Sequence, residues 1–257
     1  MTKDPRDGGP APEPLLEALL SRAVRSAKAR LSARVLEPFA QLSFAQEGED
    51  RVLCRLLAGR RGQPGFYVDV GAHHPTRFSN TYLLYTMGWR GINLDAMPGS
   101  MAAFAKKRPR DINLEIAVAE VEGELSYHAF NQPALNTFSE PLAETYRKVP
   151  GVRELSTTRI ACRPLARVLE DALPPGTSVD LLSVDVEGLD LEVLRSNDWS
   201  RVRPDLVLVE SLDAPDLAGL AGDPTVRFLA ANGYAPIAKT VNTLFFRDRL
   251  DPLRGGA

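Results

Sequence analysis

The fold class is decided by the stretch FYVDVGA, residues 66–72, in which buried-type residues lead to an acid and a glycine. A short apolar run of this kind is typical of a strand covered on both faces of a parallel sheet. Similar runs follow along the chain: GINLDA (91–96), INLEIAVA (112–119), VDLLSVDV (179–186) and DLVLVES (205–211). Helical patterns lie between them, at 80–87, 101–108, within 159–173 and at 189–197. The alternation predicts an α/β fold with a mostly parallel sheet.

The end of the chain departs from this alternation. After a helical pattern at 224–232, two strand-like runs, YAPIAKT (234–240) and NTLFFRD (242–248), are separated only by Val241. Two strands joined so tightly must be antiparallel, because a parallel pair needs a long crossover. We therefore predict a doubly wound sheet whose last strand is reversed.

Other segments lie outside this core pattern. GELSYHAF (123–130) alternates like an added strand, and we expect a long irregular insertion at 131–158 with a helix around 140–148. Residues 1–14 are rich in proline, glycine and charge, which predicts a disordered tail. Residues 15–40 predict an amphipathic helix that either packs as an oligomer arm or lies on a membrane surface. The catalytic domain is expected at 41–250, with a short tail at 251–257.

The composition excludes several classes of protein. The 257 residues carry 31 basic and 33 acidic side chains, so no global positive field attracts nucleic acid. No apolar run reaches the length of a transmembrane helix, and the first residues lack the apolar core of a secretory signal. Cys54 and Cys162 form no metal motif, and we expect them to be reduced. A cytoplasmic location is the resulting expectation.

Candidate site residues are those that end the predicted strands, because ligands of open α/β sheets bind at the carboxyl ends of the strands. The first strand ends at Asp69 and Gly71, and a glycine there permits a sharp turn and close approach to a ligand. The second ends at Asp95, where a carboxylate can accept hydrogen bonds from ribose hydroxyls. The chain has no G-x-G-x-x-G motif, which weighs against a dinucleotide cofactor.

Carboxylates also end the later strands. Asp185 and Glu187 follow the 179–186 run, where they could act as a base, bind a cation or hold substrate hydroxyls. The alternative for Glu187 is a cap on the helix that follows. Asp185, Glu210 and Asp213 would converge at adjacent strand ends, which suits either Mg²⁺ or a metal-free polar pocket.

The histidines offer a second kind of base. His73 and His74 follow the glycine turn, and a histidine is the usual general base near neutral pH. The alternative for either is a hydrogen bond within its own loop. His128, in the added strand, is expected to be structural.

The chain resembles the FkbM-type methyltransferases over about residues 41–248. The resemblance rests on six segments in order: SFAQEGEDRVL, GFYVDVGAHHPTRFSNT, GWRGINLDAMPGSM, RPRDINLEIAVAE, FNQPALNTFS and DLLSVDVEGLDLEVL. It implies a class I methyltransferase fold, a seven-stranded sheet with a reversed last strand, and S-adenosylmethionine as the methyl donor.

The resemblance also implies roles for single residues. Cofactor-binding residues would be Asp69, Gly71, Ala72, Ser79, Asn80, Thr81, Asp95 and Ala96, with 113–117 passing the adenine. Asp185 and Glu187 match the D-x-E-G motif of the family. His74 and Pro75 stand where many members have a second glycine.

We expect O-methylation of a hydroxyl on a sugar, glycan or secondary metabolite, with Asp185, His73 or His74 as the proton acceptor. Glu187, Asn136 and Glu210 are the candidate substrate-binding residues, and polar residues beside aromatics at 131–158 suit a lid over a hydroxylated substrate. The alternatives are a scaffold that binds the cofactor without turnover and, less favoured, a nicotinamide oxidoreductase. The helix at 15–40 is the candidate contact for a homo-oligomer.

Overall fold

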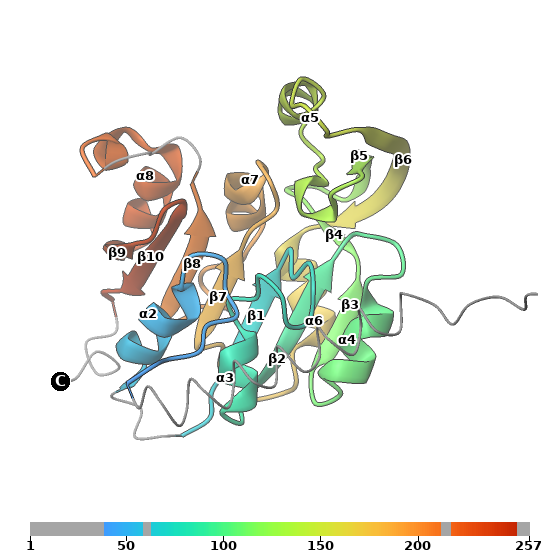
Figure 1. Cartoon of the computed structure of the whole chain (residues 1–257). Helices are drawn as coiled ribbons and strands as arrows, with labels where there is room; N and C mark the ends of the chain where they lie inside the picture. Colours follow the sequence, from blue (N-terminus) through green and yellow to red (C-terminus); the bar gives the residue numbers. More distant parts are fainter. Residues whose placement is uncertain (1–38, 59–62, 212–216, 251–257) are drawn as a thin grey trace, which may run out of the picture. The chain divides into compact units, whose positions relative to one another are not determined.

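The structure is a computed structural model that describes residues 39–58, 63–211 and 217–250 (Figure 1). The predicted tails at 1–14 and 251–257, the predicted N-terminal helix up to residue 38, and Asp213 lie outside the described residues. All described helices and strands belong to one compact unit that begins at Ser43. Among the described helices, none has the length and apolarity needed to cross a bilayer.

The main sheet has seven strands in the order β3-β2-β1-β7-β8-β10-β9. Their bounds are β1 Phe66–Val70, β2 Arg90–Asp95, β3 Ile112–Glu115, β7 Leu181–Val184, β8 Leu206–Glu210, β9 Tyr234–Lys239 and β10 Thr243–Asp248. Neighbouring strands are parallel from β3 to β8, whereas β10 runs antiparallel to both β8 and β9. The predicted fold class, with its reversed last strand, is confirmed.

Helices cover both faces of this sheet because successive strand residues point to opposite faces. Val68 and Val70 face α6 (Leu165–Ala172), α7 (Asp190–Arg195) and α8 (Pro224–Ala231) in one apolar cluster. Tyr67 faces the other way, into a cluster with Leu53 of α2 (Glu49–Leu56) and Leu84 of α3 (Tyr82–Thr86). Burial of each such side chain contributes about 1.5–3 kcal/mol. Two further helices between strands of the main sheet are α4, Met101–Lys107, and the short 3₁₀ helix η3, Gly219–Gly222.

A second, three-stranded sheet stands at one end of the main sheet (Figure 1). It consists of β4 (Ala117–Val118), β6 (Glu154–Arg163) and β5 (Gly123–Phe130), in that order, with β5 antiparallel to β6. The short helix η2 (Pro133–Leu135) and α5 (Glu140–Tyr146) connect β5 to β6. We call residues 117–163 the second-sheet module.

Two predictions need correction in this module. The expected single strand at 112–119 is divided at Ile116, so that its first part pairs with β2 and its second part with β6. The expected irregular insertion at 131–158 ends earlier, because β6 already begins at Glu154. Most of β6 is exposed, so it lacks the apolar pattern of a core strand, and the hydrogen-bonding partner that orders it is the backbone of β5.

Candidate active site

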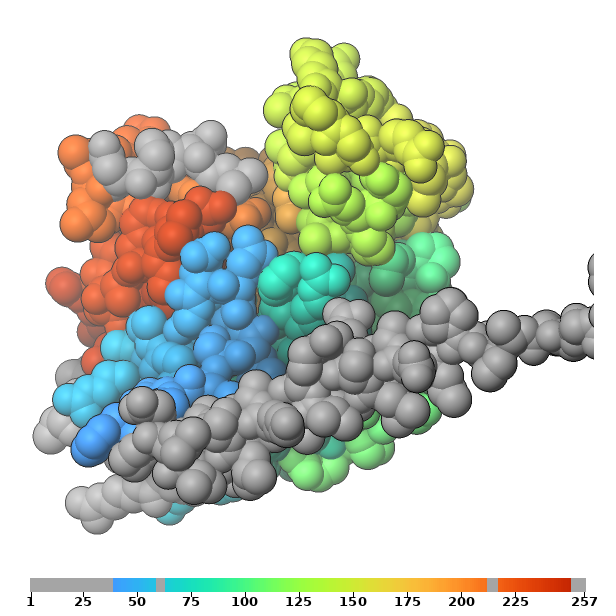
Figure 2. Space-filling view, in the orientation of Figure 1, coloured from blue at the N-terminus to red at the C-terminus, as the bar shows by residue number. Residues whose placement is uncertain are grey.

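A cleft opens at the carboxyl ends of β1, β2, β7 and β8, with a volume of about 1140 Å³ including its mouth. Figure 2 shows the surface hollowed between the second-sheet module and the C-terminal strands. The predicted site residues that line the cleft are Gly71, His73, Asn80, Asp95, Ala96, Asn136, Asp185, Glu187 and Glu210. Ile116 and Ala117, the last two residues of the predicted adenine segment, line it as well. Four separate strand tips thus contribute to one cavity.

Gly71 brings the ends of β1 and β7 together. Its φ is +79°, and a Cβ built on it would lie 1.7 Å from the carbonyl oxygen of Asp185. Its N–H and that of Ala72 donate to the Leu94 carbonyl at 2.9 and 3.0 Å, which ties the same turn to β2. No residue with a side chain fits this position without separating the two strand ends.

Asp95 orders the loop that follows β1. Its Oδ2 accepts a hydrogen bond from the His73 N–H at 2.7 Å, and its Oδ1 accepts one from the Met97 N–H at 2.8 Å. Burial raises the pKa of Asp95, and these backbone donors oppose the rise. Each carboxylate oxygen has a second lone pair, so Asp95 can still accept hydrogen bonds from a ligand in the cleft.

The two adjacent histidines have different surroundings. His73 lines the cleft, its ring stacks on Phe78 at 6.3 Å, and burial lowers its pKa, so the ring is neutral at pH 7. His74 lies outside the lining, and its Nδ1 accepts hydrogen bonds from the backbone N–H groups of Thr76 and Arg77 at 3.2 and 3.0 Å. The structure therefore places the His74 ring in its own turn and away from the cavity.

Four other predicted cofactor residues lie behind the cleft wall and outside its lining. The Thr81 hydroxyl donates to Asp69 at 2.5 Å, and the Arg108 guanidinium donates to Thr81 and Ser79 at 2.8 and 3.3 Å. Ala72 packs instead in a small apolar cluster with α4. These residues support the loop that carries Gly71, and none of the four lines the cavity.

Arg108 is the centre of that buried network, and the sequence reading missed it. The side chain is fully buried, pairs with Asp111 at 2.8 Å and donates to the Tyr67 hydroxyl at 2.6 Å. A buried charge is costly unless it is paired and hydrogen-bonded, and this guanidinium is both. In the sequence it reads only as the last residue of a helix, a place where arginine is ordinarily exposed.

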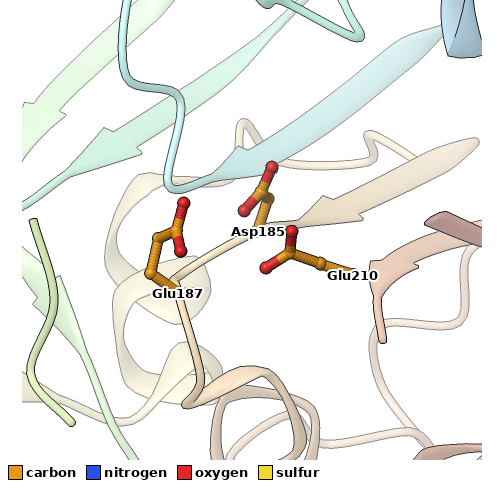
Figure 3. Close-up of side chains that lie close together, drawn as sticks. All are labelled: Asp185, Glu187 and Glu210. Atoms are coloured by element: carbon orange, nitrogen blue, oxygen red, sulfur yellow. The ribbon is translucent and has the colours of Figure 1, made fainter. Parts of the chain in front are cut away.

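Three carboxylates converge on one side of the cleft, from Asp185, Glu187 and Glu210 (Figure 3). One oxygen of each lies within 4.8 Å of the others. The Tyr146 hydroxyl of the second-sheet module donates to Glu187 at 2.7 Å. The Asp190 carboxylate accepts hydrogen bonds from two N–H groups of the loop before α7, that of Val186 at 3.0 Å and that of Gly188 at 3.2 Å. Glu187 does not cap α7, because the N-cap residue of that helix is Leu189, whose side chain makes no capping hydrogen bond.

Burial, and after it repulsion from neighbouring acids, raises the pKa values of these three carboxyl groups. Exclusion of water raises the pKa of Glu187 to about 7, and exclusion of water followed by repulsion from Glu187 and Asp190 raises that of Glu210 to about 8. The same causes, with Glu210 as the strongest neighbouring charge, raise the pKa of Asp185 well above its usual range. Near neutral pH these carboxyl groups are therefore partly protonated, and a carboxyl group must lose its proton before it can act as a base.

A seven-stranded sheet with a reversed β10 and a cleft at its carboxyl edge defines the class I methyltransferase fold. The chain belongs to the methyltransferase FkbM domain family, whose model matches residues 69–236. A comparison with curated proteins finds no match.

Solved structures with similar folds include a methyltransferase FkbM from Methylobacillus flagellatus KT, at 13% identity and a TM-score of 0.43. That match covers 72% of this chain, which spans only 43% of the length of the other. Another is 1,6-didemethyltoxoflavin-N1-methyltransferase from Burkholderia thailandensis, solved with bound 1,6-didemethyltoxoflavin and S-adenosylhomocysteine. Its identity is 15%, its TM-score 0.36, and the match covers 96% of this chain and 98% of that one.

Proposed function

We propose that the cleft binds S-adenosylmethionine and that the protein methylates a hydroxyl oxygen on a sugar, glycan or secondary metabolite. The observation that carries the proposal is that Gly71, Asp95 and Asp185, from three strand tips, line one cavity. The turn at Gly71 gives room for the methionine part of the cofactor, and Asp95 accepts hydrogen bonds from the ribose hydroxyls. Asp185 then lies beside the methyl group.

Methyl transfer from a sulfonium is an in-line displacement, in which the oxygen–carbon bond forms as the carbon–sulfur bond breaks. The positive charge on sulfur disappears during the step, so the enzyme's main task is to align the two reactants. Such alignment is worth up to about 7–11 kcal/mol. The hydroxyl must also lose its proton, and this requires an acceptor in the cleft.

We assign that proton to the carboxylate pair of Asp185 and Glu210. A general base works best when its pKa is near the working pH, and burial brings the pKa of Glu210 to about 8. Arrival of the cationic sulfonium favours the ionised carboxylates, so cofactor binding itself prepares the base. His73 is the alternative acceptor, because its ring lines the cleft and is neutral at pH 7.

The charge of the cleft favours a neutral acceptor. Among the described residues, its lining includes no lysine or arginine. It does include six acidic side chains, those of Glu47, Glu49, Asp95, Asp185, Glu187 and Glu210. A phosphorylated or carboxylated acceptor would meet like charges without a cationic partner. A polyhydroxylated neutral molecule suits the same carboxylates as hydrogen-bond acceptors.

The three clustered carboxylates also have the hard oxygen donors that Mg²⁺ prefers. We favour the metal-free assignment, because Glu187 already accepts a hydrogen bond from Tyr146 and the cluster retains protons. The cytoplasmic location, the absence of a nucleic-acid partner, and the oligomer contact through residues 15–40 stay predictions.

Replacement of Asp185 tests this assignment. We expect Asp185→Ala to lower turnover by about 10²- to 10⁴-fold, the usual effect of losing a general base, with and without EDTA in the assay. Binding of S-adenosylhomocysteine, measured by calorimetry, should change by less than about tenfold. Release of S-adenosylhomocysteine on incubation with a panel of neutral hydroxylated acceptors measures turnover.

The matched control is Asp171→Ala, which removes a surface carboxylate paired with Arg163 and should leave both readouts unchanged. Near-normal turnover of Asp185→Ala would remove Asp185 from the mechanism. Loss of activity in EDTA, with recovery on adding Mg²⁺, would assign the carboxylates to a metal instead. An unsubstituted protein that binds NADH and not S-adenosylhomocysteine would refute the methyltransferase proposal.

A further inference from the structure

One wall of the cleft comes from the second-sheet module. Tyr127 of β5, Asn136 after η2 and Phe138 all line the cavity, on the side where Asp95 and Met97 line it as well. Asn136 contacts Met97 directly, with its Nδ2 3.6 Å from the Met97 sulfur. The sequence reading placed Asn136 against the methyl acceptor, but these contacts place it beside the residues that follow β2.

The orientation of the Asn136 amide is fixed by its partners. Its Oδ1 accepts a hydrogen bond from the Phe130 N–H at 2.8 Å, and a backbone N–H can only donate. Its Nδ2 therefore points the other way and donates to the Tyr127 hydroxyl at 2.8 Å. Because the nitrogen has no lone pair to offer, the Tyr127 oxygen is the acceptor in this bond.

This arrangement sets the role of the Tyr127 hydroxyl. Its oxygen is occupied by Asn136, so its hydrogen must be directed elsewhere, and Tyr127 lines the cleft. The residue is 5% exposed and its ring packs on Phe138 with the ring centres 5.0 Å apart, which leaves the hydroxyl oxygen little freedom to move. Burial, and then the nearby charge of Asp95, raises the pKa of Tyr127, so the phenol stays protonated.

The cofactor places an acceptor in the same part of the cavity. If Asp95 takes the ribose hydroxyls, the adenosine lies between Asp95 and the residues that line the cleft after β3, which are Ile116, Ala117 and Val118. Adenine ring nitrogens and ribose oxygens accept hydrogen bonds. The apolar side chains of Met97 and Ile116 suit the faces of the base.

We propose that Tyr127, oriented by Asn136, donates a hydrogen bond to the adenosine part of S-adenosylmethionine, so that the second-sheet module belongs to the cofactor site. The assignment rests on the proposed function. It makes Tyr127 a cofactor-binding residue and Asn136 a positioning residue. The module would then contact the cofactor as well as form one wall of the cleft.

Calorimetric titration with S-adenosylhomocysteine tests the assignment. We expect Tyr127→Phe to weaken binding about threefold to tenfold, the usual effect of one lost hydrogen bond. Asn136→Ala should weaken it to a similar extent, and the double variant should be no weaker than the more affected single variant, because both changes remove the same bond. The affinity for methylthioadenosine, which lacks the amino-acid part, should fall by the same factor as the affinity for S-adenosylhomocysteine.

Two matched controls exclude a general effect of the substitutions. Tyr82→Phe removes a phenol from outside the cleft lining, and Asn131→Ala removes an amide from the same module, where it bonds Gly151 and Arg153 at the surface. Both should bind S-adenosylhomocysteine like the unsubstituted protein. Near-UV circular dichroism identifies any variant that has lost its fold.

Unchanged binding by folded Tyr127→Phe would overturn the assignment. So would a loss that affects S-adenosylhomocysteine but not methylthioadenosine, because the contact would then lie at the amino-acid end. If the unsubstituted protein binds neither ligand, the proposed function itself fails, and this outcome differs from a variant that binds normally.

Discussion

At the scale of single residues, the pKa values of the cleft carboxyl groups set the pH range in which the proposed base is ionised. Glu187 and Glu210 have pKa values raised to about 7 and about 8, since little water reaches them and other acids lie nearby. A carboxyl that accepts the acceptor's proton must first be ionised. Ionisation increases as the pH rises, so the rate must increase in the same direction.

We therefore predict that kcat/KM rises with pH across the range 6–9, steeply below about pH 7 and levelling above about pH 8. The profile of kcat should have its inflection at lower pH, because bound cationic cofactor lowers the carboxyl pKa values. Initial rates in buffers of constant ionic strength measure both profiles. A rate that is flat or falls over this range would exclude the carboxylates as the base.

The residue scale is also where sequence reasoning was least complete. Gly71, Asp95 and Asp185 could be predicted because each ends a strand, and strand ends meet at one edge of the sheet. Asp69 lies on the strand that precedes Gly71, and the family resemblance indicated Thr81. Both side chains are nevertheless buried, where Thr81 donates to Asp69 and accepts from Arg108. Asp111 lies only three residues from Arg108, but nothing near Arg108 in the sequence indicates that Tyr67 and Thr81 are its other partners. Such a network is visible only once distant segments are packed together.

At the scale of elements, the turn after β1 joins the three strand tips. The Gly71 position lies against the Asp185 carbonyl, and its N–H bonds the end of β2. A displacement of β1 at this turn would therefore also move the residues at the ends of β2 and β7, which are proposed to bind the cofactor.

We predict that Gly71→Ala weakens S-adenosylhomocysteine binding by more than about tenfold and destabilises the fold by at least about 1–3 kcal/mol. The added methyl would lie 1.7 Å from the Asp185 oxygen, so β1 and β7 must move apart at this edge. Calorimetry and urea unfolding measure the two effects.

Gly176→Ala is the matched control, because Gly176 also has a positive φ, +74°, but a Cβ there meets nothing within 4 Å. Gly176→Ala should destabilise the fold through backbone strain but leave the affinity for S-adenosylhomocysteine unchanged. Equal effects of the two substitutions would mean that the contact between Gly71 and Asp185 does not shape the cleft.

Elements were predicted well where an apolar pattern marks them and poorly where it does not. The core strands and the closing hairpin were evident because they are buried on both faces or joined by too short a loop for any other pairing. The early part of β6 was missed because its side chains are exposed. Its order comes from backbone pairing with β5, which leaves no periodic signal in the sequence.

At the scale of the whole molecule, the main sheet and the second-sheet module together enclose the cleft. The sheet contributes Gly71, Asp95 and Asp185 from its carboxyl edge, and the module contributes Tyr127 and Asn136 from outside it. Family membership accounts for the sheet and for the class of chemistry. The identity of the acceptor depends on the remaining lining, whose charge is wholly acidic among the described residues.

The most direct test of the account is a crystal structure of the protein with S-adenosylhomocysteine bound. The account predicts the ribose hydroxyls on Asp95, the homocysteine chain along the turn at Gly71, and the sulfur facing Asp185 across the same cleft. A ligand bound elsewhere, or one that contacts only one of these three residues, would contradict it.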